Sequence, residues 1–206
     1  MLDGTEIAGT EVLDAVRGHL VRYYPGLTSP IHQDATAHPV EQAARLVQED
    51  LCLLVPGDGE LVLGAASDCF PSRWLLRDKI GRPLLAIHGP TPGYDQQLGR
   101  PTGDFLSRLV PERPVWRLNW SLMSDPSLFQ GVSARSPHQG AGITAEEIGH
   151  RIWLRVERQT LRRFEHSVCF TIRTFVWPLG EALRGEPAAR AAREQSGHHG
   201  RRLRRV

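Results

Sequence analysis

The segment Leu51–Ala66 reads LCLLVPGDGELVLGAA, and it decides the fold class. Two short apolar runs, Leu51–Val55 and Leu61–Ala66, flank the turn residues Pro56–Glu60, which include an Asp-Gly pair. Apolar runs separated by a Gly-rich turn of this kind predict a β-hairpin. We therefore expect two adjacent antiparallel strands here.

Three further strands are predicted in the second half of the chain. They cover Val115–Met123, Ile152–Leu161 and Val168–Trp177, and the last two are joined through residues 162–167 in a second hairpin-like connection. In the first of them, large apolar residues alternate with polar ones, so the two sets point to opposite faces. The apolar set (Trp116, Leu118, Trp120 and Leu122) is interpreted as core or as the wall of a cofactor site. The polar residues Arg117 and Asn119 form either an alternative polar site or anchors for the N-terminal helices.

Helices are predicted before and between these strands. Thr10 is placed to cap a helix that ends before Pro25, and Pro39 is placed to begin a second helix. Shorter helices are expected from Ser72 to Ile80, with Gly81 as the left-handed residue after it, and over 104–110. Thr144-x-x-Glu147 resembles a capping box for one helical turn. The fold class is therefore α+β, with a five-stranded antiparallel sheet, helices between its second and third strands and an N-terminal helical lead.

The 206 residues are enough for one domain with its own core. We expect a helical lead over 1–50, the main domain over 51–180 and a disordered Arg-rich tail over 181–206. No apolar run approaches the roughly 18 residues of a membrane span, and the acidic N-terminus does not resemble a secretory signal, so we expect a cytoplasmic protein without membrane contact. The net charge of the chain is only +2, and seven of its arginines lie in the tail. The folded body is therefore not basic, so it does not indicate a nucleic-acid partner. Among the 25 lysine and arginine residues, Lys79 alone is lysine.

His88 is the strongest candidate ligand among the nine histidines. It follows the apolar run Leu84–Ile87 and precedes Gly89–Gly93, a loop that two prolines stiffen, because each fixes its own φ and restricts the preceding residue. A histidine at the edge of an apolar wall, on a stiff loop, suits a role as a ligand in a dry cavity. The alternative is an ordinary structural or surface histidine.

Arg158 is the second candidate. Strand alternation places it on the same face as the apolar residues Leu154 and Val156, where an unpaired charge would be costly. It therefore needs an anion, which could be a cofactor carboxylate, a substrate anion or a glutamate of the chain, unless it lies at the strand end in water. Arg155 and Glu157 share the opposite face, where salt bridges to helices are expected.

Several motifs have a specific resemblance to a known family. They are Gln48–Leu51, Cys69-Phe70-Pro71-Ser72-x-Trp74, Lys79–Gly81, Ile87-His88-x-Pro90-x-Pro92, Arg117-x-Asn119-Trp120 and the arginine-rich run Arg155–Arg163. Together they resemble the haem-dependent oxidative N-demethylase alpha-subunit family over roughly Val12–Leu179.

This resemblance implies a PAS-like domain that binds haem b and oxidises a small secondary amine, such as dimethylamine, to an imine whose hydrolysis releases formaldehyde. It implies His88 as the axial ligand, with Arg158 and Arg155 as propionate or pocket contacts. It also implies a separate reductase component carrying flavin and an iron–sulfur cluster. Two features depart from the family pattern, namely the Arg/His/Gly tail and Phe164-Glu165-His166 in place of the expected turn. The alternatives are a PAS-type haem-binding or sensing module without turnover and a haem-free interaction domain.

Overall fold

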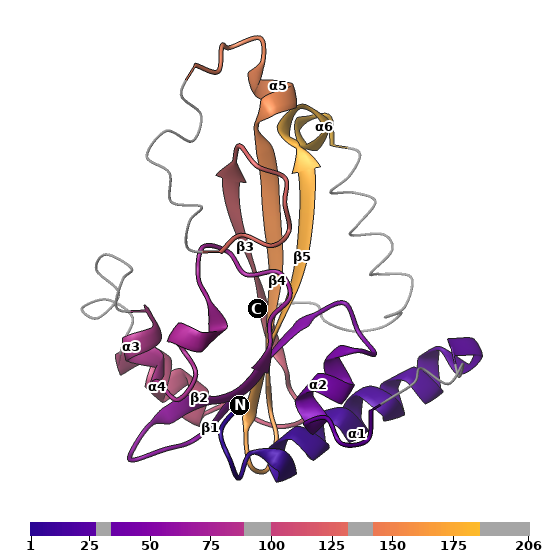
Figure 1. Cartoon of the computed structure of the whole chain (residues 1–206), viewed down its shortest axis with the longest axis vertical. Helices are drawn as coiled ribbons and strands as arrows, with labels where there is room; N and C mark the ends of the chain where they lie inside the picture. The colour runs from indigo at the N-terminus through magenta and orange to yellow at the C-terminus, as the bar shows by residue number, and fades with distance from the viewer. Residues whose placement is uncertain (28–33, 89–99, 132–141, 186–206) are drawn as a thin grey trace. The chain divides into compact units, whose positions relative to one another are not determined.

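The computed structural model describes residues 1–27, 34–88, 100–131 and 142–185. It contains a five-stranded antiparallel sheet with the strand order β2-β1-β5-β4-β3, which confirms the predicted α+β class (Figure 1). The strands are β1 (Asp50–Pro56), β2 (Leu61–Ser67), β3 (Val115–Met123), β4 (Trp153–Arg163) and β5 (Val168–Pro178). The predicted Gly89–Gly93 loop, residues 132–141 and the tail from residue 186 lie outside the described residues.

The chain divides into two compact units. Within the described residues, the larger unit contains residues 1–27, 34–88, 100–119, 128–131 and 157–174, and the smaller unit contains residues 120–127, 142–156 and 175–185. No helix of the described residues is long and apolar enough to cross a membrane.

Strand β1 is the centre of the larger unit because it pairs on both sides. It pairs with β2 from Leu51 opposite Ser67 to Pro56 opposite Leu61, with a register shift after Leu53, and this confirms the predicted hairpin. On its other edge it pairs with β5, where Cys52 lies opposite Phe170. Successive residues of a strand point to opposite faces, so β1 contributes side chains to two separate cores.

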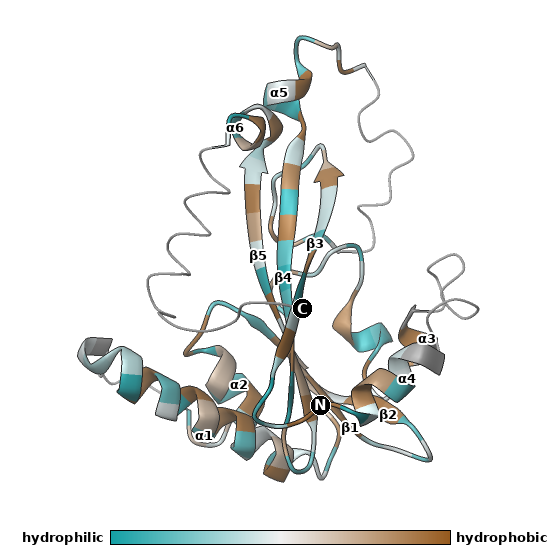
Figure 2. Ribbon diagram, turned by 180° about the vertical axis from the view of Figure 1, so that it is seen from behind, coloured by the Kyte–Doolittle hydropathy of each residue, from teal (hydrophilic) through white to brown (hydrophobic). Residues whose placement is uncertain are grey.

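The first core lies between the sheet and two helices, α1 (Glu6–Tyr23) and α2 (Pro39–Ala44), and we call this side the α1–α2 face. Figures 1 and 2 both show these two helices on one side of β1 and β2, with α3 and α4 on the other. A short 3-10 turn, η1 (Pro25–Leu27), follows α1. The buried residues of this core are Ala8, Val12, Leu13, Val40, Ala43, Leu51, Leu53, Ala65 and Cys169.

Helix α1 begins five residues earlier than predicted, at Glu6 rather than after Thr10. The start is fixed by Thr5, which is 4% exposed and whose Oγ1 donates to the Leu2 carbonyl at 2.7 Å and lies 3.1 Å from His38 Nε2. The Thr10 hydroxyl instead donates a hydrogen bond to the Glu6 carbonyl within the helix. Tertiary contacts around Thr5 therefore set the helix start, and sequence alone does not show them.

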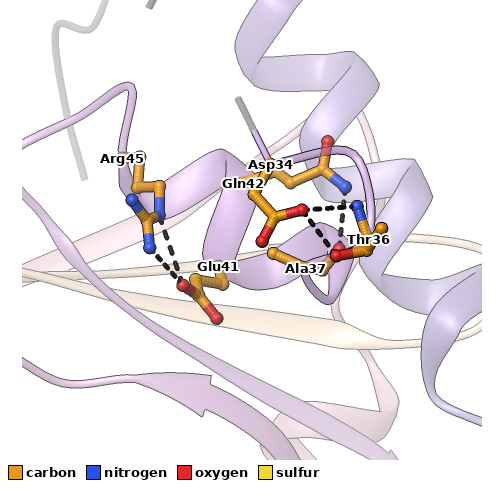
Figure 3. A network of polar contacts seen from close by, with 6 residues as sticks. All are labelled: Asp34, Thr36, Ala37, Glu41, Gln42 and Arg45. Carbon is orange, nitrogen blue, oxygen red and sulfur yellow. Dashed lines mark hydrogen bonds and ion pairs between the residues drawn. The ribbon is translucent and has the colours of Figure 1, made fainter. Parts of the chain in front are cut away.

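Helix α2 begins at Pro39, as predicted, because the residues before it form a local hydrogen-bonded turn. Asp34 accepts bonds from the backbone and side chain of Thr36, and Gln42 reaches back to the Ala37 carbonyl at 2.8 Å (Figure 3). The Nδ1 of His38 then accepts the Val40 N–H at 3.2 Å, which caps the helix.

The second core lies on the opposite face of β1, which we call the pocket face. It includes the even-numbered Cys52 and Leu54 of β1, and it packs against α3 (Leu84–His88) and α4 (Arg100–Ser107).

The prediction of a helix from Ser72 to Ile80 is wrong, since only the 3-10 turn η2 (Leu76–Asp78) forms there. Ser72 makes a β-bridge with Gln130, and Arg73 has a φ of 63°, which no α-helix allows. The φ of Gly81 is 77°, which confirms its predicted left-handed conformation. The helix predicted over 104–110 ends earlier, at Ser107.

In the smaller unit, two short helices pack closely, α5 (Ile148–Arg151) and α6 (Leu179–Leu183). A Cβ added at Gly180 would lie 3.0 Å from the Gly149 carbonyl oxygen, so glycine is needed for this approach. The Thr144 N–H donates to the Glu147 carboxylate at 3.0 Å, as in the predicted capping box, although α5 begins only at Ile148.

The apolar stripe of β3 is largely exposed, so the interpretation of these residues as core is wrong. Trp116 is 59% and Trp120 is 66% exposed, and Leu118 is similarly open. The physical reason is the strand order, because β3 is an edge strand of the sheet and the apolar core forms around β1.

Candidate functional site

The larger unit contains a pocket of about 590 Å³ on its pocket face. This volume is typical of small-molecule and cofactor sites. Two thirds of the lining residues are apolar, and five of these are the aromatic residues Phe70, Trp74, Phe105, Trp116 and Phe170, so Trp116 of β3 is part of a pocket wall. Seven polar residues share the lining, namely Ser72, Lys79, Thr102, Arg117, Asn119, Glu157 and Gln159.

The floor of the pocket comes from the central strands. Cys52 and Leu54 of β1 and Phe170 and Ile172 of β5 line it, and the pairing of Cys52 with Phe170 places these side chains on the same face. Burial raises the pKa of the Cys52 thiol well above its usual range. Cys52 therefore acts here as a small apolar side chain and not as a thiolate nucleophile.

The Cys-Phe-Pro turn that follows β2 is held by one buried carboxylate. Asp50, which is 2% exposed, accepts the Cys69 N–H at 2.7 Å and the Phe70 N–H at 3.3 Å. The turn continues into Ser72, and the Arg73 N–H donates to the Gln130 carbonyl at 2.8 Å. Asp50 thus fixes the backbone that places Phe70 and Ser72 in the pocket wall.

Helices α3 and α4 form another part of the wall. Residues just before α3 pair with β2, since the Leu63 N–H donates to the Arg82 carbonyl at 3.0 Å and Val62 bridges Pro83. Leu84 and Ile87 of α3 then line the pocket. At the end of α4, Arg163 of β4 donates to the Leu106 carbonyl at 2.7 Å, where a cation is favoured by the helix dipole.

Lys79 lies in the pocket wall beside an aromatic ring. Its Nζ is 4.4 Å from the centre of the Trp74 ring, a cation–π distance. Burial lowers the pKa of Lys79. The one lysine of the chain therefore supplies a partly desolvated positive charge to the pocket.

A ladder of polar side chains links β3 and β4 on the pocket wall. Arg117 Nε donates to Gln159 Oε1 at 2.9 Å, Gln159 Nε2 donates to Glu157 Oε2 at 3.0 Å, and Asn119 Nδ2 donates to the same oxygen at 3.2 Å. All four side chains line the pocket. Arg117 and Asn119 therefore belong to the alternative polar site, and the expectation that they anchor the N-terminal helices is wrong.

His88 is the last residue of α3, one residue after Ile87 and four after Leu84, both of which line the pocket. The structure thus places the backbone of the predicted ligand at the end of a helix whose Leu84 and Ile87 line the pocket. The side chain of His88 and the Pro/Gly loop after it lie outside the described residues.

Arg158 forms an ion pair with a glutamate and is not among the residues that line the pocket. Its Nη2 lies 3.3 Å from Glu49 Oε1, and Arg173 lies 3.8 Å from the same oxygen. One of the predicted alternatives for Arg158, a glutamate of the chain, is therefore present. By strand alternation Arg158 points away from the side of Glu157 and Gln159. Arg155 belongs to the smaller unit and is only 1% exposed.

Sequence reasoning gave little weight to Lys79, Glu157 and Gln159. Two signals could have found them. The single lysine among so many arginines was visible, as was the matched polar spacing of Arg117-x-Asn119 and Glu157-x-Gln159 on two strands. Such spacing makes a cross-strand ladder once the register is known.

A second polar group lies on the α1–α2 face. Glu11, Glu165 and His166 have possible ligand atoms within 4.8 Å of one another, but His166 Nδ1 is bonded to Glu11 at 3.0 Å and the group is largely exposed. The bond to Glu11 raises the pKa of His166. This contact ties the β4–β5 turn to α1.

Comparison with protein families finds a match over most of the chain. The family model described as "Haem-dependent oxidative N-demethylase, alpha subunit-like" matches residues 1–197 of the 206 residues. The match includes every residue that lines the pocket.

Proposed function

Because the chain belongs to the haem-dependent oxidative N-demethylase alpha-subunit-like family, we propose that it binds haem b in this pocket and acts on a small secondary amine. The observation that carries the proposal is a pocket of about 590 Å³ whose wall includes α3, the helix that ends at His88. The strand order and the helices between β2 and β3 are compatible with a PAS-like domain.

The described residues suit a haem group. Haem is a flat, largely apolar macrocycle with two carboxylates, so it needs apolar and aromatic walls and nearby positive charge. Phe70, Trp74 and Phe170 supply aromatic surface, and Lys79 and Arg117 supply two cations in the same wall. We propose these two cations as partners for the carboxylates. The roles of Arg155 and Arg158 as haem contacts stay predictions of the resemblance.

We propose that His88 would hold the haem iron. Its place at the end of α3, beside the pocket-lining Ile87, supports this role. Haem supplies redox and oxygen chemistry when it is bound. The protein side chains hold it, exclude water with the apolar wall and orient the amine.

In the proposed reaction the secondary amine loses two electrons and two protons across its N–CH3 bond and becomes an imine. Water then adds to the imine carbon, and the C–N bond breaks to give formaldehyde and the primary amine. We propose dioxygen as the oxidant: the two electrons from the amine, together with two electrons and two protons supplied through a separate reductase with flavin and an iron–sulfur cluster, would reduce it to two molecules of water. The family description as an alpha subunit supports the existence of partner subunits.

The test is haem loading of the full chain, measured by the Soret absorption band, for wild type, His88→Ala and the control His150→Ala. His150 is an exposed histidine of α5. A Soret band that is present in wild type and His150→Ala but collapses in His88→Ala is expected. A folded wild-type protein that takes up no haem would overturn the proposal. Haem uptake without formaldehyde release from dimethylamine, in the presence of an electron donor, would favour the non-catalytic haem module instead.

A further inference from the structure

Resting on the proposed function for the source of its ligand, we propose that Lys79 is a covalent capture site for small aldehydes, and that formaldehyde and haem compete for it. Lys79 is half-buried and belongs to the lining of the pocket. In the proposed reaction, each turnover releases formaldehyde inside this pocket. An amine in the pocket wall therefore meets a higher local concentration of the aldehyde than an amine on the outer surface does.

The position of this amine is set by Trp74. Lys79 Nζ lies 4.4 Å from the centre of the Trp74 ring, and both residues line the pocket. Among the described residues, Lys79 forms no ion pair with a carboxylate. A carboxylate in contact would hold the proton on the nitrogen, and a protonated amine has no lone pair with which to attack a carbonyl carbon. The described surroundings thus hold the amine in the wall without a carboxylate that keeps it protonated.

Burial favours the neutral, reactive form of this amine. It lowers the pKa of Lys79, and the charges of Cys52 and Asp68 oppose this shift to a smaller extent. Desolvated lysines in apolar pockets act as nucleophiles toward carbonyl compounds. Arg117, which lines the same pocket, cannot react in this way because a guanidinium stays protonated. Lys79 is the one lysine of the chain, so it is the one side-chain amine that can do this.

The capture step needs no oxidant or reductant. The lone pair of the neutral Lys79 nitrogen forms a C–N bond to the aldehyde carbon while the C=O π bond breaks, which gives a carbinolamine. The former carbonyl oxygen then leaves as water, together with the two protons that the nitrogen carried. The product is an imine of Lys79, and the step reverses when water adds back to the imine carbon.

Haem and the aldehyde need opposite forms of the same nitrogen. Under the proposed function, a haem carboxylate pairs with the protonated Lys79 and keeps the lone pair from reacting. An imine nitrogen is a weaker base than an amine, so the captured form carries less positive charge and pairs less well with that carboxylate. Haem should therefore protect Lys79 from formaldehyde, and captured formaldehyde should slow the uptake of haem by an empty pocket.

The experiment compares two lysines in one molecule, the haem-free full chain with Arg77→Lys. Arg77 belongs to the same turn as Lys79, and its side chain is 81% exposed. Formaldehyde is added with cyanoborohydride, which delivers hydride to the imine carbon and traps it as a methylamine, and peptide mass spectrometry measures the methylation rate of each lysine. We expect Lys79 to react about threefold faster or more, and its rate to level off at a lower pH, because each unit by which a pKa is lowered makes the neutral amine about tenfold more abundant at a given pH.

Equal or slower methylation of Lys79 would overturn the inference. If Arg77→Lys does not fold, Arg113→Lys gives the same comparison, since Arg113 is also exposed. Haem loading, read from the Soret band, should slow the methylation of Lys79 and leave that of the added lysine unchanged. Unchanged methylation of Lys79 after haem uptake would overturn the competition. If the chain takes up no haem, the proposed function fails on its own, and preferential methylation of Lys79 would still support the capture site.

Discussion

The two faces of β1 in the larger unit have the same strand in common and differ in what covers it. On the α1–α2 face, Leu51 and Leu53 are 2% and 0% exposed and join a core of small and aliphatic side chains. On the pocket face, Cys52 and Leu54 are equally buried, but they border an open volume of about 590 Å³. One face is filled by the chain itself, and the other leaves space for a ligand.

Within this one strand, the side chains on one face therefore contribute mainly to stability, and those on the other face contribute mainly to ligand binding. Each methyl group removed from a closed core lowers the free energy of unfolding, because the neighbouring side chains relax only partly into the cavity. A pocket wall already has open space beside it, so truncation there alters the site more than the stability. Mutations on the two faces should therefore affect different measurements.

The largest expected effect is on the α1–α2 face, for Leu53→Ala. Leu53 is fully buried, so we expect a loss of about 2–5 kcal/mol in the free energy of unfolding. Urea unfolding followed by circular dichroism measures it. The matched control is Cys52→Ala on the other face, which removes one sulfur atom at the pocket floor and should cost about 1 kcal/mol or less. Equal losses for the two variants would remove the distinction between the faces.

The next effect concerns Gly64 of β2. A Cβ there would lie 2.6 Å from Val55 Cγ2 and 2.9 Å from Thr5 Cγ2, so Gly64→Ala should destabilise by about 1–3 kcal/mol through overpacking. Gly18→Ala is the control, since nothing lies within 4 Å of a Cβ in that position of α1, and alanine there should stabilise by up to about 1 kcal/mol. Thermal unfolding of both variants tests the pair, and a stabilised Gly64→Ala would show that the packing at Thr5 is loose.

These sites also show which features of the fold can be predicted from the sequence. The β1–β2 hairpin was predictable because its turn residues and apolar runs are local signals. The start of α1 and the absence of a helix over 72–80 were not, because they depend on Thr5 meeting His38 and on Ser72 pairing with Gln130, contacts between residues more than thirty positions apart.

The candidate site was predictable in part for the same reason. Alternation alone put Arg117 and Asn119 on one face of β3 and Glu157 on one face of β4, but nothing local joins the two strands. Only the pairing of β3 with β4 brings these side chains together as a ladder. The exposure of Trp116 likewise depends on β3 being an edge strand.

A smaller effect, on the α1–α2 face, depends on pH through His38. Burial lowers the pKa of His38, and its neutral Nδ1 accepts the Val40 N–H that caps α2. The unfolded state therefore binds the proton more readily, so this stability is present above about pH 6.5 and is lost as the pH falls through the lowered pKa. In His38→Asn the side-chain oxygen can still cap the helix but does not titrate. As the pH falls from 7.5 to 5, wild type should lose about 1 kcal/mol of unfolding free energy relative to His38→Asn. A difference between the two proteins that does not change with pH would contradict this prediction.

The smallest effect on stability is expected on the pocket face, at Lys79. Because Lys79 is the one lysine, reductive ¹³C-methylation labels it and the N-terminus only, and NMR can follow its titration directly. Burial should place its pKa below the ordinary 10.5, and a value at or above 10.5 would show that the pocket wall is open to water there. Lys79→Met keeps the stem against Trp74 and removes the charge, so we expect a change in unfolding free energy within about 0.5 kcal/mol but weaker haem retention. A large loss of stability with unchanged haem retention would mean that Lys79 supports the fold, and the two faces of β1 would then differ less than their packing indicates.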